Sequence, residues 1–173
     1  SNPIIPKIPG AEKLETYEAN ALLRAGTCVG EKVVVLGGGL VGSEAALQLS
    51  NCGKDVTIVE MMDDILLTVK HSLNNDQALR RLIDESDVKI RTGTRLVEAA
   101  DGGVIVEKDG TKETIPCDTL VYAVGYASNR NLENELHGKI EKVVTIGDNV
   151  KPAKVIDAVH QGYHTARLLE YLD

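Results

Sequence analysis

Three glycines with the spacing G-x-G-x-x-G, Gly37, Gly39 and Gly42, lie between two apolar runs, and an acid, Glu60, ends the second run. In this pattern the first glycine allows a tight turn, the second lets the backbone approach a pyrophosphate, and the third lets helix and strand pack closely. The start of the following helix attracts phosphate, and an acid about twenty residues downstream accepts hydrogen bonds from an adenosine ribose. The spacing therefore predicts a dinucleotide site. The alternatives are a glycine turn without a ligand and an acid at the protein surface.

The residues around Glu60 indicate which dinucleotide would bind. A 2′-phosphate on the ribose would meet the Glu60 carboxylate, whereas NADP sites place an arginine nearby. The next four residues, Met61, Met62, Asp63 and Asp64, contain no cation. We therefore expect NAD(H) to be preferred over NADP(H).

Hydrophobic periodicity predicts the elements that must position these residues. The apolar runs at 33–36 and 56–59 predict strands at 32–36 and 56–60, and such runs are typical of parallel strands buried on both faces. Between them we expect a helix that stops at Gly53 and turns one apolar stripe to the sheet, formed by Val41, Ala45, Leu49 and Cys52. Capping residues at 74–76 predict a second helix, followed by a strand at 88–91. The apolar stripe of that helix is Leu79, Leu82 and Ile83.

The middle of the chain changes character. Turn signals at 101–103 and 109–110 separate three short segments, which predict an antiparallel meander over 94–98, 104–107 and 112–115. After the meander we predict a buried strand at 119–124 and a polar loop at 126–138. A short strand at 143–146 and a final helix at 152–172 complete the prediction. The predicted fold class is α/β, a Rossmann-like parallel sheet with helices on its faces and the antiparallel β-meander replacing one crossover.

The amino-terminal part of the chain contains prolines at every third position, Pro3, Pro6 and Pro9. Prolines with this spacing exclude a helix interior and predict an extended connector. A short helix is expected at 15–24, ending near Gly26.

Composition excludes several classes of protein. The net charge of −7 argues against a nucleic-acid surface, and no apolar run approaches the roughly 20 residues that cross a bilayer. The three separated cysteines, Cys28, Cys52 and Cys117, predict reduced, buried thiols in a cytoplasmic protein. His160 and His164 are one helical turn apart, but no third ligand lies near them in the sequence. We therefore expect no metal site.

The chain lacks the acid–base residues of a self-contained dehydrogenase. No Tyr-x-x-x-Lys occurs, since Tyr126 is followed four residues on by Arg130 and Tyr163 by Arg167. We predict no catalytic residue in this chain. An autonomous NAD-dependent dehydrogenase and a non-enzymatic dinucleotide sensor remain as the alternatives to a module of a larger reductase.

Three motifs together resemble the two-dinucleotide flavoprotein reductases: GGGLVGSE at 37–44, DTLVYAVGYASN at 118–129 and VTIGD at 144–148. The run KPAKVIDAVHQGYHTAR at 151–167 is similar to the C-terminal end of one group of them. That group contains 2,4-dienoyl-CoA reductase, 2-enoate reductase and the NADH:flavin oxidoreductases (NADH oxidases) related to old yellow enzyme. The opening SNPIIPKIPG resembles the segment that crosses from the FAD domain into the NAD domain. One departure is Ala127-Ser128, where many relatives have Arg-Pro.

The resemblance implies an incomplete enzyme. In that group an FMN-bearing barrel with an iron–sulfur cluster comes first, and a FAD domain with an inserted NAD domain follows. This chain has one glycine fingerprint, whereas the full module has two. We therefore expect a connector with a short helix at 1–30, the NAD domain at 31–126 and the returning tail of an incomplete FAD domain at 127–173. The expected partners are NADH and the remaining FAD and barrel domains, with no nucleic acid and no membrane.

The resemblance also implies roles for single residues. Glu44 would lie close to the nicotinamide, the alternative being a solvated helix glutamate, and Gly125 would allow the nicotinamide half to approach. Asp148 would bind the FAD ribitol in the intact enzyme. The implied chemistry is hydride transfer from NADH to FAD, with reduction of an activated C=C bond in other domains. The full set of predicted cofactor-binding residues is Gly37, Gly38, Gly39, Leu40, Val41, Gly42, Glu44, Glu60, Met61, Gly125 and Asp148.

Overall fold

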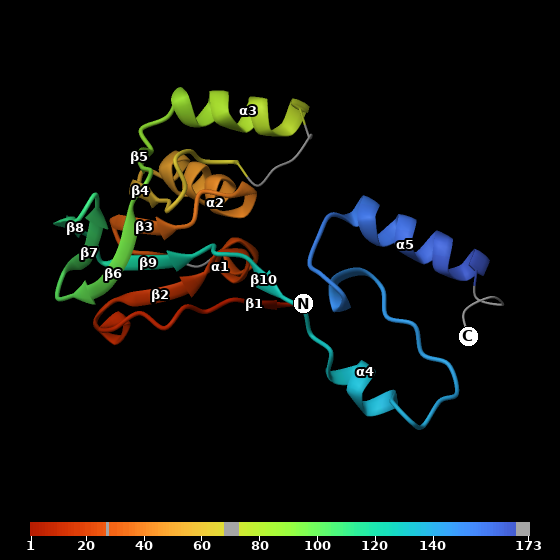
Figure 1. The fold of residues 1–173 in the computed structure, drawn as a ribbon. Coiled ribbons are helices and arrows are strands. Elements are labelled where there is room, and N and C mark those ends of the chain that lie inside the picture. The colour runs from red at the N-terminus through yellow and green to blue at the C-terminus, as the bar shows by residue number, and fades with distance from the viewer. Residues whose placement is uncertain (27, 68–72, 169–173) are drawn as a thin grey trace. The chain divides into compact units, whose positions relative to one another are not determined.

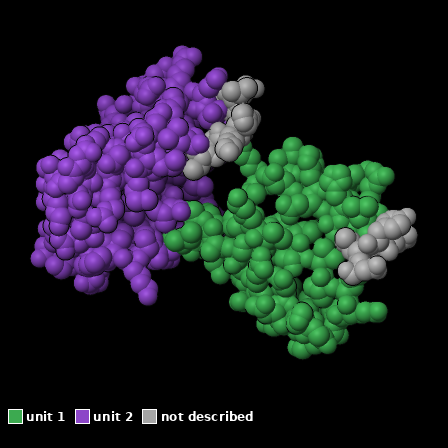
Figure 2. Space-filling model, viewed as in Figure 1, with its two compact units in different colours: residues 1–4, 125–173 green, residues 5–124 purple. Residues whose placement is uncertain are grey.

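The computed structural model describes residues 1–26, 28–67 and 73–168, with the backbone alone at residues 25, 73 and 74 (Figure 1). Two compact units make up the chain (Figure 2). One contains residues 5–124, and the other contains residues 1–4 together with 125–173. Within the described ranges, no helix is both long and apolar enough to cross a membrane.

A parallel sheet of five strands, in the order β2-β9-β3-β4-β5, forms the centre of the 5–124 unit. Its strands are β2 (Glu15–Glu18), β3 (Lys32–Leu36), β4 (Asp55–Val59), β5 (Lys89–Arg91) and β9 (Thr119–Tyr122). In the middle of the sheet, Val34 of β3 pairs with Thr57 on one side and Leu120 on the other. The predicted α/β fold with a parallel sheet is confirmed.

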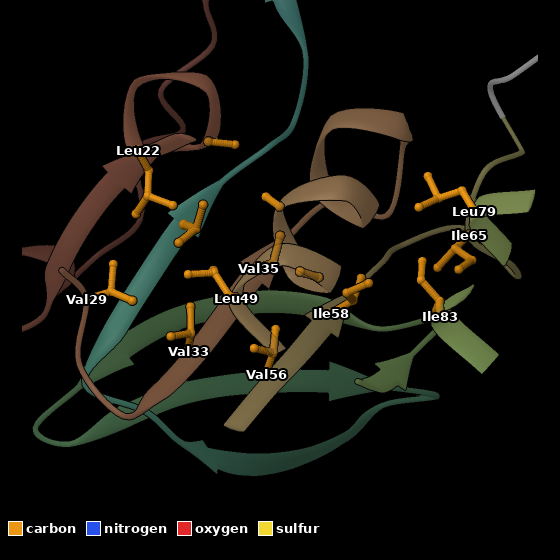
Figure 3. Close-up of a cluster of buried hydrophobic side chains, with 14 of the residues drawn as sticks. Leu22, Val29, Val33, Val35, Leu49, Val56, Ile58, Ile65, Leu79 and Ile83 are labelled. Atoms are coloured by element: carbon orange, nitrogen blue, oxygen red, sulfur yellow. The ribbon is translucent and has the colours of Figure 1, made fainter. Parts of the chain in front are cut away.

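Side chains of the central strands are buried on both faces of the sheet, as their continuous apolar runs predict. Val33 and Val35 join the cluster formed with helices α1 (Ala19–Ala25), α2 (Leu40–Asn51) and α3 (Leu73–Asp84). Figure 3 shows Val33 and Val35 among labelled side chains from these helices. Val34 and Leu36 belong to the second cluster, on the opposite face. Because alternate strand residues point to opposite faces, one run of residues supplies both cores.

The opposite face of the parallel sheet is covered by the meander β6-β7-β8, an antiparallel sheet of three strands. Its strands are β6 (Arg95–Ala100), β7 (Gly103–Lys108) and β8 (Thr111–Pro116). Val104 and Val106 of β7 are fully buried in this second cluster. The segment before the short 3-10 helix η1 (Ala11–Lys13) is tied to the meander, because the Ala99 N–H donates to the Pro9 carbonyl at 2.8 Å.

The prediction of a helix at 15–24 is wrong for the first part of the segment and correct for the second. Its first part is the edge strand β2, and only α1 follows as helix. Thr16 and Tyr17 have high β-propensity, and they pair with Leu120 and Val121 of β9. The Glu18 carboxylate then accepts the N–H groups at the start of α1, so this residue ends the strand and caps the helix.

Three side chains predicted to be buried are exposed. Leu82 of α3 is 50% exposed, because the helix turns Leu79 and Ile83 to the core and places Leu82 beside that stripe. Cys52 follows the last residue of α2, where the helix end meets solvent, and Cys28 lies in the loop before β3. Only Cys117, packed under the meander, follows the prediction.

The second unit begins with a small antiparallel pair, β1 (Asn2–Pro3) with β10 (Tyr126–Ala127). It continues with α4 (Asn131–Leu136), η2 (Gly147–Asn149) and α5 (Val155–Leu168). The strand predicted at 143–146 is absent, since no strand among the described residues pairs with this segment. The final helix starts three residues after Pro152, where the Asp157 carboxylate accepts the Lys154 N–H. The predicted part of that helix beyond 168 lies outside the described residues.

Candidate functional site

The glycine turn joins β3 to α2 in a conformation that side chains would block. Gly37 has φ +105°, and a Cβ there would lie 2.5 Å from the Ala123 carbonyl oxygen. A Cβ at Gly42 would overlap the carbonyl oxygen of Gly37. The first glycine therefore permits the turn, and the third lets the helix pack against it.

The amino end of α2 has no side chain bound to it among the described residues. Gly39 is the N-cap residue, and the first turn contains no acid. Ser43 is buried, and its hydroxyl donates to the Gly38 carbonyl oxygen at 3.3 Å. The first N–H groups of a helix have no partner within the helix, and together with the helix dipole they favour an anion.

Glu60, just after β4, reaches back to the glycine turn. Its Oε2 accepts the Gly38 N–H at 2.6 Å, and its Oε1 accepts the Met62 N–H at 2.8 Å. The backbone of Glu60 is also fixed, since its N–H donates to Arg91 and its carbonyl accepts the Thr94 N–H. A carboxylate has about four lone-pair sites, so two bound N–H groups leave capacity for two hydroxyls. This geometry fits the predicted ribose-binding role.

The loop after Glu60 folds onto the glycine turn, which the sequence analysis missed. The Leu66 N–H donates to the Gly38 carbonyl oxygen at 2.7 Å, and Ile65 is 1% exposed. Met61, in contrast, is 67% exposed beside Glu60. The signal for the buried part of the loop was available, because an Ile-Leu pair outside any predicted helix or strand indicates a loop that contributes to the core.

Four more predicted residues lie in or directly before α2. Gly38 is buried within the turn. Leu40 and Val41 are half-buried and pack against the cluster on the helix face of the sheet. Glu44 is exposed on the helix surface. The structure therefore brings the glycine turn, the start of α2 and Glu60 together, with Glu44 one turn further along the helix.

Gly125 and Asp148 belong to the other unit. Gly125 has φ +102°, and its carbonyl accepts the Ile4 N–H at 2.9 Å. Asp148 is exposed in η2, where Oδ2 accepts the Ser1 hydroxyl at 2.7 Å and Oδ1 accepts the Ala153 N–H at 3.3 Å. These hydrogen bonds, chiefly that from Ser1, hold the pKa of Asp148 below its ordinary value.

The two histidines of α5 lie close to each other. The ring centroids of His160 and His164 are 6.5 Å apart, edge to face. In the described part of the chain, no three His, Cys, Asp or Glu side chains gather as metal ligands would.

Comparison with known proteins gives the site its context. The sequence profile of the pyridine nucleotide-disulphide oxidoreductase family matches residues 1–162. The chain belongs to this family. Proteins of this family use FAD and NAD(P)H, and the match confirms the resemblance to flavoprotein reductases at the level of the family.

Two curated relatives are similar over nearly the whole chain. Cinnamate reductase of Clostridium sporogenes is 35% identical over 170 residues, covering 96% of this chain and 25% of the relative. NADH oxidase of Thermoanaerobacter brockii is 37% identical over 172 residues, covering 96% of this chain and 26% of the relative. The chain therefore spans about a quarter of the length of these relatives.

Two solved structures are also similar to this chain. A structure of 2-naphthoyl-CoA reductase in complex with 2-naphthoyl-CoA matches with a TM-score of 0.82 and 29% identity, covering 94% of this chain and 24% of that one. Histamine dehydrogenase from Rhizobium sp. 4-9 matches with a TM-score of 0.85, covering 98% of this chain and 27% of that one. Because the two sequences are only 22% identical, this match shows the fold alone.

Proposed function

We propose that this chain is the NADH-binding module of a flavin-dependent oxidoreductase and that it positions NADH for hydride transfer to FAD. The observation that carries the proposal is the pair of hydrogen bonds that hold the Glu60 carboxylate between Gly38 and Met62. NADH, when bound, supplies the hydride for such a reaction. The residues of this chain bind, orient and select the nucleotide.

Each part of the site would have a separate task. The turn at Gly37 and the uncapped start of α2 would receive the pyrophosphate, with Gly38, Leu40 and Val41 alongside. Glu60 would accept two ribose hydroxyls and repel a 2′-phosphate, which favours NADH over NADPH. Met61, exposed next to it, would cover the adenine.

The other predicted residues would serve the reacting end and the flavin. We propose that Glu44 and Gly125 lie near the nicotinamide and that Asp148 binds the FAD ribitol. The chain spans about a quarter of its relatives' length. The rest of the FAD site, and a barrel with FMN and an iron–sulfur cluster, would accordingly be contributed by other parts of the parent protein. There an activated C=C bond would be reduced, in line with the name of the cinnamate reductase relative.

Calorimetric titration of the purified chain with NADH and with NADPH tests the proposal. We expect a single site that binds NADH more tightly. Tighter binding of NADPH, or binding of neither nucleotide, would overturn it. Tightly bound yellow flavin would contradict the incomplete FAD site, and NADH oxidation by the flavin-free chain in the presence of a carbonyl acceptor would favour the autonomous dehydrogenase.

A further inference from the structure

Arg80, in α3, binds the loop between β4 and α3 at two points. Its Nη1 donates to Asp64 Oδ1 at 3.0 Å, and its Nη2 donates to the Ile65 carbonyl oxygen at 2.7 Å. The same Asp64 oxygen accepts the Ile65 N–H at 2.8 Å. The Arg80 hydrogen bond is the main reason that the pKa of Asp64 lies below its ordinary value. One guanidinium therefore fixes both a side chain and a backbone carbonyl of this loop.

The loop held by Arg80 lies against the middle glycine of the turn. Ile65 fills the space in front of Gly38, where a Cβ would lie 2.7 Å from its Cγ2. The next residue, Leu66, has φ +62°, which is unfavourable for a leucine. In that conformation its N–H reaches the Gly38 carbonyl oxygen at 2.7 Å. The surrounding contacts must maintain this backbone conformation, and Arg80 supplies two of them.

Gly38 links the loop to Glu60. Its carbonyl accepts the hydrogen bond from Leu66, and its N–H donates to Glu60 Oε2 at 2.6 Å. If the loop moved away, the Gly38 carbonyl oxygen would lose its 2.7 Å bond and keep the longer one from the Ser43 hydroxyl at 3.3 Å, so the backbone at Gly38 would be held less firmly. The Glu60 carboxylate would then lose a fixed donor.

We propose that Arg80 is a positioning residue for the dinucleotide site: it clamps the 64–66 loop onto Gly38 and thereby holds Glu60 ready to bind the ribose. The inference rests on the proposed function, since it concerns the same site. A binding group held in place before the ligand arrives loses less entropy on binding. Arginine suits this task because its planar fork reaches two acceptors at once, which the single ammonium of lysine cannot do as well.

Two variants of Arg80 and one neighbour test the proposal in the full chain. Arg80→Met removes both bonds and Arg80→Lys keeps the charge. Arg81→Met is the matched control, because Arg81 is exposed on the same helix and its Nε bonds only to Glu85 among the contacts described, at 2.8 Å. We expect the NADH dissociation constant to rise about tenfold in Arg80→Met, less in Arg80→Lys, and not at all in Arg81→Met.

Two further readouts separate positioning from general stability. Amide hydrogen exchange without ligand should become faster at Leu66 and Gly38 in Arg80→Met, and stay unchanged at Val34 in the sheet. In a double variant with Glu60→Gln, the loss of NADH affinity should be smaller than the sum of the two single losses, because both changes act on one contact. If Arg80→Met does not fold, hydrogen exchange and the double-variant affinity are measured with Arg80→Lys instead.

The outcomes distinguish this inference from the function on which it rests. Unchanged affinity and unchanged exchange at Leu66 in the Arg80 variants, with normal NADH binding by the unmodified chain, would overturn the inference and leave the function standing. Strictly additive losses with Glu60→Gln would also overturn it. Failure of the unmodified chain to bind NADH would overturn the function itself.

Discussion

The backbone N–H of Gly38 donates a 2.6 Å hydrogen bond to Oε2 of Glu60, which joins the turn after β3 to the end of β4. The carboxylate is therefore part of the turn before any nucleotide binds. Its other oxygen accepts the Met62 N–H at 2.8 Å, so both oxygens are held. Changes at either residue should affect binding and local structure together.

Replacing the acid tests this link directly. Glu60→Gln keeps the size but has one accepting oxygen, so either Gly38 or Met62 would face an amide NH₂ group. We expect NADH binding to weaken by about 1–3 kcal/mol and the preference over NADPH to shrink. Calorimetric titration measures both, with Glu85→Gln as the control, since Glu85 is exposed and pairs with Arg81. Unchanged affinity in Glu60→Gln would indicate that Glu60 is a surface acid that does not contribute to NADH binding.

Two helical glycines should respond in opposite ways to alanine. In Gly42→Ala the new Cβ would overlap the Gly37 carbonyl, so we expect a loss of about 1–3 kcal/mol in unfolding free energy and weaker NADH binding. In Gly162→Ala of α5 the nearest group is Ile146 Cδ1 at 3.7 Å, so the better helix propensity should stabilise that helix by about 0.5–1 kcal/mol. Urea denaturation followed by circular dichroism measures both. Equal stability of Gly42→Ala and the unmodified chain would contradict the close approach.

Asp118 should make stability depend on pH. Burial raises its pKa, but the N–H of Lys32, the hydroxyl of Thr119 and the N–H of Glu31 lower it more, so it lies below the ordinary value. The ionised group therefore stabilises the fold above the ordinary pKa of about 3.9, and this contribution is lost as pH falls through the folded-state pKa. We expect Asp118→Asn to be less stable than the unmodified chain at pH 7, with the gap closing towards pH 3.

Denaturation at a series of pH values measures this gap. Asp101→Asn, in the exposed turn between β6 and β7, is the control and should show no such convergence. A constant difference between Asp118→Asn and the unmodified chain from pH 7 to pH 3 would argue that the carboxylate charge is irrelevant.

The three cysteines should differ in reactivity. Burial, with a smaller contribution from the Asp118 charge, raises the pKa of Cys117 to about 11, and its side chain is covered by the meander. Cys28 and Cys52 are exposed. At pH 8 we expect iodoacetamide to modify Cys28 and Cys52 in the native protein and Cys117 only after denaturation, because the thiolate is the reacting form. Peptide mass spectrometry distinguishes the three sites. Equal rates at Cys117 and Cys52 would show that the meander opens readily.

Some parts of the fold could be predicted from the sequence because the signals are local. The apolar runs at 33–36 and 56–59 predict the buried strands β3 and β4, and the turn residues at 101–103 and 109–110 predict the meander. The segments 15–24 and 143–146 were predicted incorrectly, the first as helix throughout and the second as a strand. Whether these segments become strands depends on a neighbouring strand: β9 supplies one for β2, and no described strand supplies one for 143–146.

The sequence by itself determined the glycine turn and the acid after the second strand, because residue type and spacing suffice for a positive φ at Gly37 and a carboxylate at Glu60. Only the tertiary structure decided what holds them. The loop at 64–66, the left-handed Leu66 and the clamp from Arg80 bring together residues far apart in the chain. Such contacts depend on how β4, α3 and the turn pack, and no local periodicity encodes that packing.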